Sequence, residues 1–218
     1  MNNDPTPRQA LVTHGRRINE LGINQGRSGN LSVRTPDGAS FLITPSGLAY
    51  ETMDPGDIVL MRWDGTHQGT AGRLPSSEWR LHRDIYRAHD QALAIVHAHP
   101  MFATTLSCLD RGIPAFHYMV AVAGGCDIRC APYATYGSQE LSDHALTALR
   151  DRRACLHGHH GMTVFGTSLE EAVTLAMEVE TLAAMYWRSL QIGEPTTLSA
   201  DEMAVVLEKF RTYGKIVT

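Results

Sequence analysis

Lysine is nearly absent from this chain of 218 residues, which has only Lys209 and Lys215, both close to the C-terminal end. Enzymes that form a Schiff base need a desolvated lysine, usually on a core element, so this scarcity disfavours that chemistry. The other basic residues are scattered arginines, and the formal net charge is -4. Because proteins that bind nucleic acids or membrane surfaces carry clustered positive charge, we expect neither kind of partner.

Four other patterns are also missing. No apolar run approaches the roughly 20 residues of a membrane span, and the polar start of the chain lacks the apolar region of a signal peptide. There is no Gly-x-Gly-x-x-Gly fingerprint of a dinucleotide site, and the four cysteines show no Cys-x-x-Cys spacing. We therefore expect a cytoplasmic protein with reduced thiols and no structural zinc knuckle.

The apolar pattern predicts one domain over residues 1–218. Helical spacing predicts helices near residues 11–21, 76–89, 141–149, 168–193 and 199–210. Short apolar or β-branched runs predict strands near residues 31–34, 41–44, 58–61, 92–99 and 162–166. Helices interleaved with short, hairpin-like strands favour an α/β sandwich, in which a largely antiparallel central sheet is flanked by helices.

Histidines at two places in the sequence have the spacing of metal ligands. His97 and His99 stand two residues apart at the end of a predicted strand, so their imidazoles face the same side. A third imidazole from the later cluster would complete a three-histidine site with an open coordination position, which is typical of catalytic zinc. The spacing does not choose among His157, His159 and His160, because His157 and His159 are also an i, i+2 pair.

Glu78 and three loops are further candidates for a site. The helix macrodipole favours an acidic residue in the first turn of the predicted helix 76–89, but an ionised carboxylate there can also transfer a proton. The loops 28–30, 44–47 and 75–77 are rich in glycine, serine and threonine, and the third directly precedes Glu78. Backbone N–H groups and hydroxyls of such loops can bind phosphate with few cations, although each composition is also that of an ordinary turn.

Three longer motifs connect this chain to a known family. They are Leu74-Pro75-Ser76-Ser77-Glu78-Trp79-Arg80, Ile113-Pro114-Ala115-Phe116-His117-Tyr118-Met119 and Ala131-Pro132-Tyr133-Ala134-Thr135-Tyr136-Gly137. With them the sequence resembles the class II aldolase/adducin family, most closely its L-fuculose-1-phosphate aldolase branch, over nearly its whole length. The resemblance implies an α/β domain around a largely antiparallel sheet, assembled as a cyclic homotetramer with active sites at subunit interfaces.

The resemblance also implies roles for individual residues. The implied metal ligands are His97, His99 and His160, which would hold one divalent ion per subunit, Zn²⁺ by preference and Mn²⁺, Fe²⁺ or Co²⁺ as alternatives. Glu78 falls on the catalytic acid/base and Tyr118 on a proton donor that reaches in from a neighbouring subunit. Tyr213 falls on a tyrosine that closes over the site, in a mobile tail from about residue 211. The implied phosphate-binding residues are Gly29, Asn30, Ser46, Gly47, Ser76 and Ser77.

The implied reaction is the reversible cleavage of a ketose 1-phosphate into dihydroxyacetone phosphate and an aldehyde. Tyr136, in the expected aldehyde pocket, stands where this branch usually has phenylalanine, and Ala98 stands where it usually has a polar residue. L-Fuculose 1-phosphate, 5-deoxyribulose 1-phosphate and 5-methylthioribulose 1-phosphate are therefore all candidate substrates. The alternatives are a methylthioribulose-1-phosphate dehydratase, a pentulose-5-phosphate 4-epimerase, which would normally have aspartate at position 78, and a non-catalytic adducin-like domain, which would lose metal ligands.

Overall fold

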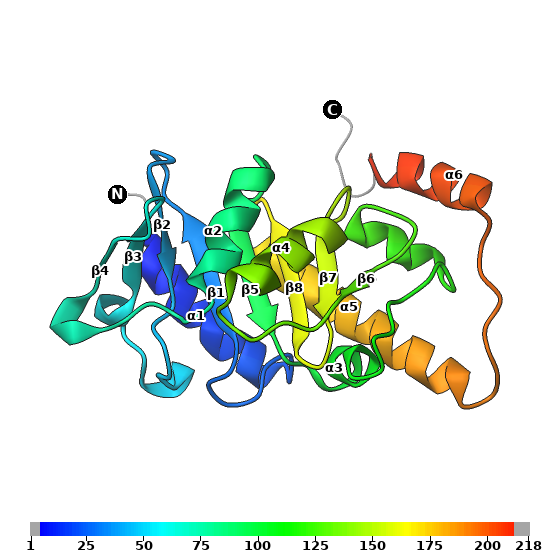
Figure 1. The fold of residues 1–218 in the computed structure, drawn as a ribbon, viewed down its shortest axis with the longest axis horizontal. Coiled ribbons are helices and arrows are strands. Elements are labelled where there is room, and N and C mark those ends of the chain that lie inside the picture. The colour runs from blue at the N-terminus through cyan, green and yellow to red at the C-terminus, as the bar shows by residue number, and fades with distance from the viewer. Residues whose placement is uncertain (1–4, 212–218) are drawn as a thin grey trace.

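A computed structural model describes residues 5–211 and shows one sheet of eight strands in the order β4-β3-β2-β1-β5-β8-β7-β6 (Figure 1). All neighbouring strands are antiparallel except β6 and β7, which are parallel. The strands are β1 (Asn30–Arg34), β2 (Ser40–Ile43), β3 (Val59–Arg62), β4 (His67–Gln68), β5 (Ala94–Ala98), β6 (Arg129–Ala131), β7 (Ala154–His157) and β8 (Gly161–Gly166).

Helices cover both faces of this sheet. α1 and α5 pack on one face, and α2 and α4 lie on the other, in front of the sheet in Figure 1. The helices are α1 (Pro7–Glu20), α2 (Trp79–Ala88), α3 (Met101–Ser107), α4 (Gln139–Ala148), α5 (Leu169–Leu190) and α6 (Ala200–Phe210), with short 3₁₀ helices η1 (Tyr50–Thr52), η2 (Pro55–Asp57), η3 (Thr70–Gly72) and η4 (Tyr118–Ala123). The predicted α/β sandwich with a largely antiparallel sheet is confirmed.

The two faces of the sheet bury two separate apolar cores. Successive side chains of a strand point to opposite faces, so Val96 of β5 joins the core under α5 while Ile95 joins the core under α2. In β8, Met162 and Phe165 divide in the same way. Any polar side chain at an alternate position of a central strand is therefore buried between the sheet and its covering helices.

The main differences from the sequence prediction lie around Pro100 and before the later histidines. Pro100 ends the strand as expected, but it also starts α3, which the sequence analysis did not predict. No side chain at the N-terminus of α3 caps the helix; instead the carboxylate of Glu180, on α5, accepts hydrogen bonds from the backbone N–H groups of Phe102 and Ala103 at 2.9 and 2.8 Å. A cap supplied from so far along the chain leaves no local sequence signal. The sequence analysis also missed β7. This strand has only four residues and lies between a charged turn and the loop that precedes β8.

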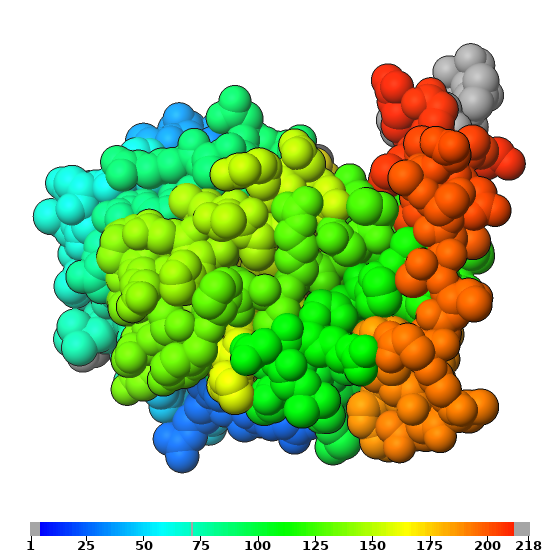
Figure 2. Space-filling model, turned by 45° about the vertical axis from the view of Figure 1, so that its right-hand side comes forward, coloured from blue at the N-terminus to red at the C-terminus, as the bar shows by residue number. Residues whose placement is uncertain are grey.

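The C-terminal helix stands at the edge of the molecule. Figure 2 shows α6 in orange and red beside the green segment that contains η4, and these two elements pack together. The predicted mobile tail and Tyr213 lie outside the described residues, apart from Arg211. None of the described helices is both long enough and apolar enough to cross a membrane.

Candidate active site

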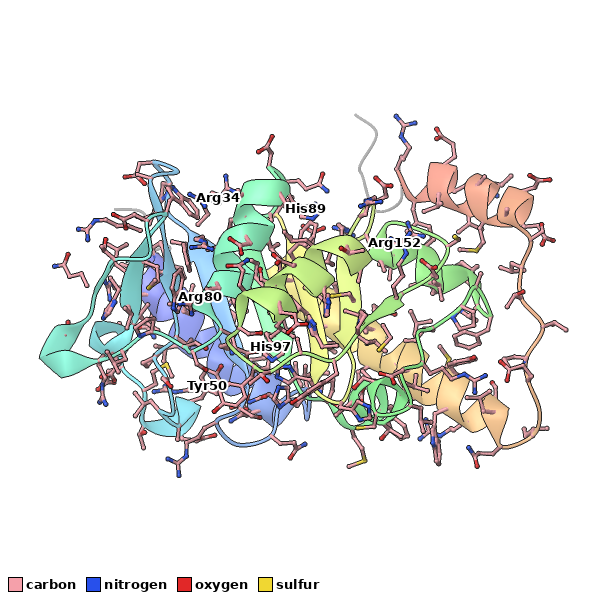
Figure 3. All side chains as sticks on the ribbon, in the orientation of Figure 1. Arg34, Tyr50, Arg80, His89, His97 and Arg152 are labelled. Atoms are coloured by element: carbon pink, nitrogen blue, oxygen red, sulfur yellow. The ribbon has the colours of Figure 1, made fainter. Side chains whose placement is uncertain are left out.

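Strand register places three polar side chains in a row across the middle of the sheet. Asn30 of β1 pairs with His97 of β5, and His97 pairs with Thr163 of β8. Their neighbours along the strands, Leu31, Val96 and Met162, point into the core under α5. The row of polar side chains therefore lies on the opposite face, which α2 covers. His97 is completely buried near the centre of the molecule (Figure 3). The residues Asn30, His97 and Thr163 therefore lie together, buried on one face of the sheet.

A cluster of three imidazoles forms at one end of this row. The Nε2 atoms of His97 and His99 are 3.0 Å apart, and the ring of His160 is centred 4.8 Å from each of the other two rings. One nitrogen from each of the three histidines lies within 4.8 Å of the others. Burial and the neighbouring imidazoles lower the pKa of His99 to about 3 and that of His160 to about 4. Both rings are thus neutral at pH 7, which is the form that binds metal ions.

The structure separates the three histidines that the spacing left open. His157 lies behind the cluster, fully buried, with its Nε2 2.7 Å from the hydroxyl of Thr163. His159 has a positive φ of 54°, and its half-exposed side chain lines the cavity with its Nε2 3.7 Å from the Asp110 carboxylate. Of these three, only His160 joins His97 and His99.

Gly161 explains why a glycine follows His160. A Cβ atom at this position would lie 2.6 Å from both the carbonyl oxygen of Ala98 and the Cδ2 atom of His99, and real Cβ atoms do not approach other atoms so closely. The loop therefore reaches His99 only because residue 161 has no side chain. The same close approach brings His160 to the other two imidazoles.

Glu78 lies at the edge of the cluster rather than inside the first turn of a helix. The predicted helix 76–89 begins at Trp79, and the Glu78 side chain makes no capping hydrogen bond. Instead, its buried Oε2 lies 2.9 Å from Nδ2 of Asn30 and 3.1 Å from Nε2 of His97, while Oε1 lies 3.5 Å from Nε2 of His160. Burial disfavours the carboxylate, but the charge and hydrogen bond of His97 outweigh it and lower the pKa of Glu78 far below its usual range. Glu78 is therefore ionised at neutral pH.

A cavity of about 380 Å³ opens over Glu78, His99 and His160. Residues of all three glycine- and serine-rich loops line this cavity. A short bridge between Pro45 and Pro75 joins the second loop to the third. The structure thus brings together the candidate phosphate-binding residues Gly29, Asn30, Ser46, Gly47, Ser76 and Ser77.

The aromatic candidates lie farther out. Tyr136 lines the cavity and is 67% exposed, whereas Tyr118 on η4 is 51% exposed and does not line the cavity within this chain. Sequence reasoning missed Arg27, the only arginine or lysine among the described residues that line the cavity. Its Nη1 lies 3.3 Å from the carbonyl oxygen of Gly47. Its position directly before the loop 28–30 was the available signal in the sequence.

Comparison with known proteins identifies the family. Residues 9–187 match the family described as Class II Aldolase and Adducin N-terminal domain. The chain belongs to the class II aldolase/adducin family. Within this family it is 55% identical over 207 residues to 5-methylthioribulose-1-phosphate/5-deoxyribulose-1-phosphate aldolase of Rhodospirillum rubrum, which covers 95% of this chain and 92% of that protein.

Two further members of the class II aldolase/adducin family show similar agreement. L-Fuculose phosphate aldolase of Escherichia coli (strain K12) is 50% identical over 198 residues, which are 90% of each chain. The solved structure of an L-fuculose 1-phosphate aldolase superposes with a TM-score of 0.91 at 40% identity, covering 95% of this chain and 97% of that one.

Proposed function

We propose that this member of the class II aldolase/adducin family is a lyase that reversibly cleaves a ketose 1-phosphate into dihydroxyacetone phosphate and an aldehyde. One observation carries the proposal: an ionised, buried Glu78 lies against three clustered imidazoles at the base of a cavity walled by phosphate-type loops. The aldolase names of the similar proteins support the same reaction class.

The three imidazoles fit one divalent metal ion. His97, His99 and His160 present neighbouring nitrogens, and the buried Oε1 of Glu78 beside them has no hydrogen-bond partner in the described part of the chain. Zn²⁺ is the preferred ion, because three histidines with an open position are a common ligand set of catalytic zinc. Three imidazoles also suit Mn²⁺, Fe²⁺ or Co²⁺, which are the alternatives. When bound, such an ion supplies Lewis acidity that stabilises negative charge on the substrate oxygens as the carbon–carbon bond breaks.

The residues of the chain bind the substrate and move its protons. The phosphate would bind the loops, where backbone N–H groups and hydroxyls converge near the start of α2. Glu78 would remove a proton from the carbon beside the carbonyl of dihydroxyacetone phosphate in condensation, and return it after cleavage; Oε1 is free to carry this proton, since Oε2 accepts from Asn30. Tyr118 from a neighbouring subunit of a homotetramer would serve the aldehyde oxygen, and Tyr213 would close over the site.

A panel of aldehydes tests this function. Purified protein is supplied with dihydroxyacetone phosphate, each divalent metal and one of L-lactaldehyde, acetaldehyde or methylthioacetaldehyde, which are the fragments expected from the three candidate ketose phosphates. We expect condensation products with at least one aldehyde, and their analysis names the physiological class. Loss of water from 5-methylthioribulose 1-phosphate without carbon–carbon cleavage would instead identify a dehydratase, and no reaction with any metal would contradict catalysis.

Arg27→Ala is expected to raise the KM for the sugar phosphate about tenfold and to leave kcat nearly unchanged. Arg27 is the cation beside the phosphate-type loops, and a hydrogen bond from a charged group contributes about 1.5–3 kcal/mol. Contacts of equal strength in ground and transition states change KM alone. Steady-state kinetics at low and high salt measure the effect, with Arg87→Ala, exposed on α2, as the control. An unchanged KM would exclude Arg27 from phosphate binding.

Thr163→Val is expected to weaken metal binding about 10- to 100-fold, the usual cost of removing a partner of a ligand. The Thr163 hydroxyl lies 3.1 Å from Nδ1 of His97, the ring nitrogen that faces away from the cluster, and so fixes the orientation of this imidazole. Competition with a chelator measures the affinity. Thr163→Ser, which keeps the hydroxyl, should bind the metal almost normally; equal affinities for the valine and serine variants would contradict this role.

A further inference from the structure

Behind Glu78, polar side chains of α2 and β1 alternate in a single line. Glu78, at the N-cap of α2, is followed at four-residue spacing by His82 and Tyr86 within α2, and this aligns the three along one side of the helix. Opposite them, Asn30 and Ser32 stand two residues apart on the same face of β1. Four residues of helix and two residues of strand both span about 6 Å, so each strand side chain fits between two helix side chains.

An unbroken chain of hydrogen bonds runs along this line. The Tyr86 hydroxyl is 2.7 Å from Oγ of Ser32, and this Oγ is 2.6 Å from Nδ1 of His82. Nε2 of His82 is 2.5 Å from Oδ1 of Asn30, and Nδ2 of Asn30 is 2.9 Å from Oε2 of Glu78. All five side chains are at most 4% exposed, so water does not compete for these bonds.

The chemistry of the groups fixes the direction of every bond. Nδ2 of Asn30 can only donate, so it donates to Oε2 of Glu78, and the carbonyl oxygen Oδ1 accepts from Nε2 of His82. His82 must then donate from Nε2, and since burial lowers its pKa to about 3, the ring is neutral and Nδ1 accepts from the Ser32 hydroxyl. Ser32 in turn accepts from Tyr86. Each donor therefore points toward Glu78.

We propose that His82 is a positioning residue for the aldolase reaction: by donating from Nε2 to Asn30, it fixes the asparagine amide and through it the Glu78 carboxylate. This inference rests on the proposed function, because it concerns the proton transfer assigned to Glu78. Without the donor, Oδ1 of Asn30 loses its partner on α2, and the amide is no longer held in one place between the helix and Glu78. The hydrogen bond to Oε2 then weakens, and the carboxylate shifts from the position from which it reaches the substrate.

The expected consequence is a loss of kcat. A displacement of about 1 Å of a catalytic group costs about 10²-fold in rate, and partners of active-site groups contribute about 10- to 100-fold. We therefore expect His82→Leu to lower kcat about 10- to 100-fold, with a smaller change in KM. His82→Gln places an amide NH₂ near the former position of Nε2, so it should recover most of the loss.

The experiment compares these two variants with Asp84→Asn. Asp84 is also buried on α2, but it bonds Gln139 and Ser142 on α4 instead of joining the chain. For each full-length variant one measures kcat, KM, metal content, thermal midpoint and the exchange of solvent deuterium into dihydroxyacetone phosphate, which reports the proton transfer assigned to Glu78 without the aldehyde step. We expect slow exchange in His82→Leu, recovery in His82→Gln, and a lowered thermal midpoint with normal exchange in Asp84→Asn.

The outcomes separate this inference from the proposed function. An inactive wild-type protein would overturn the proposed function itself. An active wild type with normal exchange in a folded His82→Leu variant would overturn only the role of His82, as would equal losses in His82→Leu and His82→Gln. If His82→Leu does not fold, a crystal structure of Tyr86→Phe and the tautomer of His82 in the wild type, observed by neutron diffraction, decide the matter: a proton on Nδ1 rather than Nε2 would overturn the proposal.

Discussion

Glu78→Gln is expected to lower kcat for ketose 1-phosphate cleavage about 10²- to 10⁴-fold, the usual contribution of a general acid or base. Glutamine has nearly the same size, and its amide oxygen can still accept the hydrogen bond from Asn30, but it cannot take up a proton. Metal content should remain at the wild-type value, because the three imidazoles are unchanged. Steady-state kinetics, metal analysis and deuterium exchange into dihydroxyacetone phosphate measure the three quantities.

The control for this variant is Asp90→Asn, an exposed acidic residue just beyond the end of α2. It removes one negative charge from the chain as Glu78→Gln does, so the general effect of charge is matched, and its kcat should stay near the wild-type value. A Glu78→Gln variant with undiminished turnover would remove Glu78 from the mechanism. Loss of the metal together with activity would show instead that the carboxylate chiefly serves the metal site.

The sequence allowed prediction of those parts of the site that depend on local periodicity. His97 and His99 face the same side because a strand alternates, and this needs no knowledge of the fold. The choice among His157, His159 and His160 depends on a tight loop whose middle residue has a positive φ and on the close approach of Gly161 to His99. Spacing carries no information on either, so the resemblance to a family was needed to select His160.

Long-range pairing was equally inaccessible from local patterns. Asn30, His97 and Thr163 lie in one row only because three strands, distant in sequence, pair in a particular register. His82 gave no signal, since a single histidine within an amphipathic helix is usually structural or exposed. The role proposed for His82 depends on the match between the four-residue spacing along α2 and the two-residue alternation of β1. The longer apolar helices and strands were predictable, because their burial follows from the 3.6- and two-residue periods, whereas the short elements α3 and β7 were not.

His160→Ala is expected to abolish stable metal binding and to lower kcat/KM by about 10³-fold or more. The site would keep only two imidazoles, and Lewis-acid stabilisation of several kcal/mol corresponds to at least this change in rate. Metal analysis after gel filtration and steady-state kinetics with added Zn²⁺, Mn²⁺, Fe²⁺ or Co²⁺ measure both effects. In the wild type, a chelator should produce the same loss, and adding back the native ion should reverse it.

His159→Ala is the matched control, because it removes an imidazole from the adjacent position of the same loop. The side chain of His159 lies beside Asp110 and is not one of the three clustered imidazoles, so its removal should leave the metal content unchanged. A difference between the two variants therefore separates the ligand from the loop that carries it. Wild-type metal content in both His160→Ala and His159→Ala would contradict a site built on His97, His99 and His160. Loss of metal from both would place the loop conformation, rather than one imidazole, in control of binding.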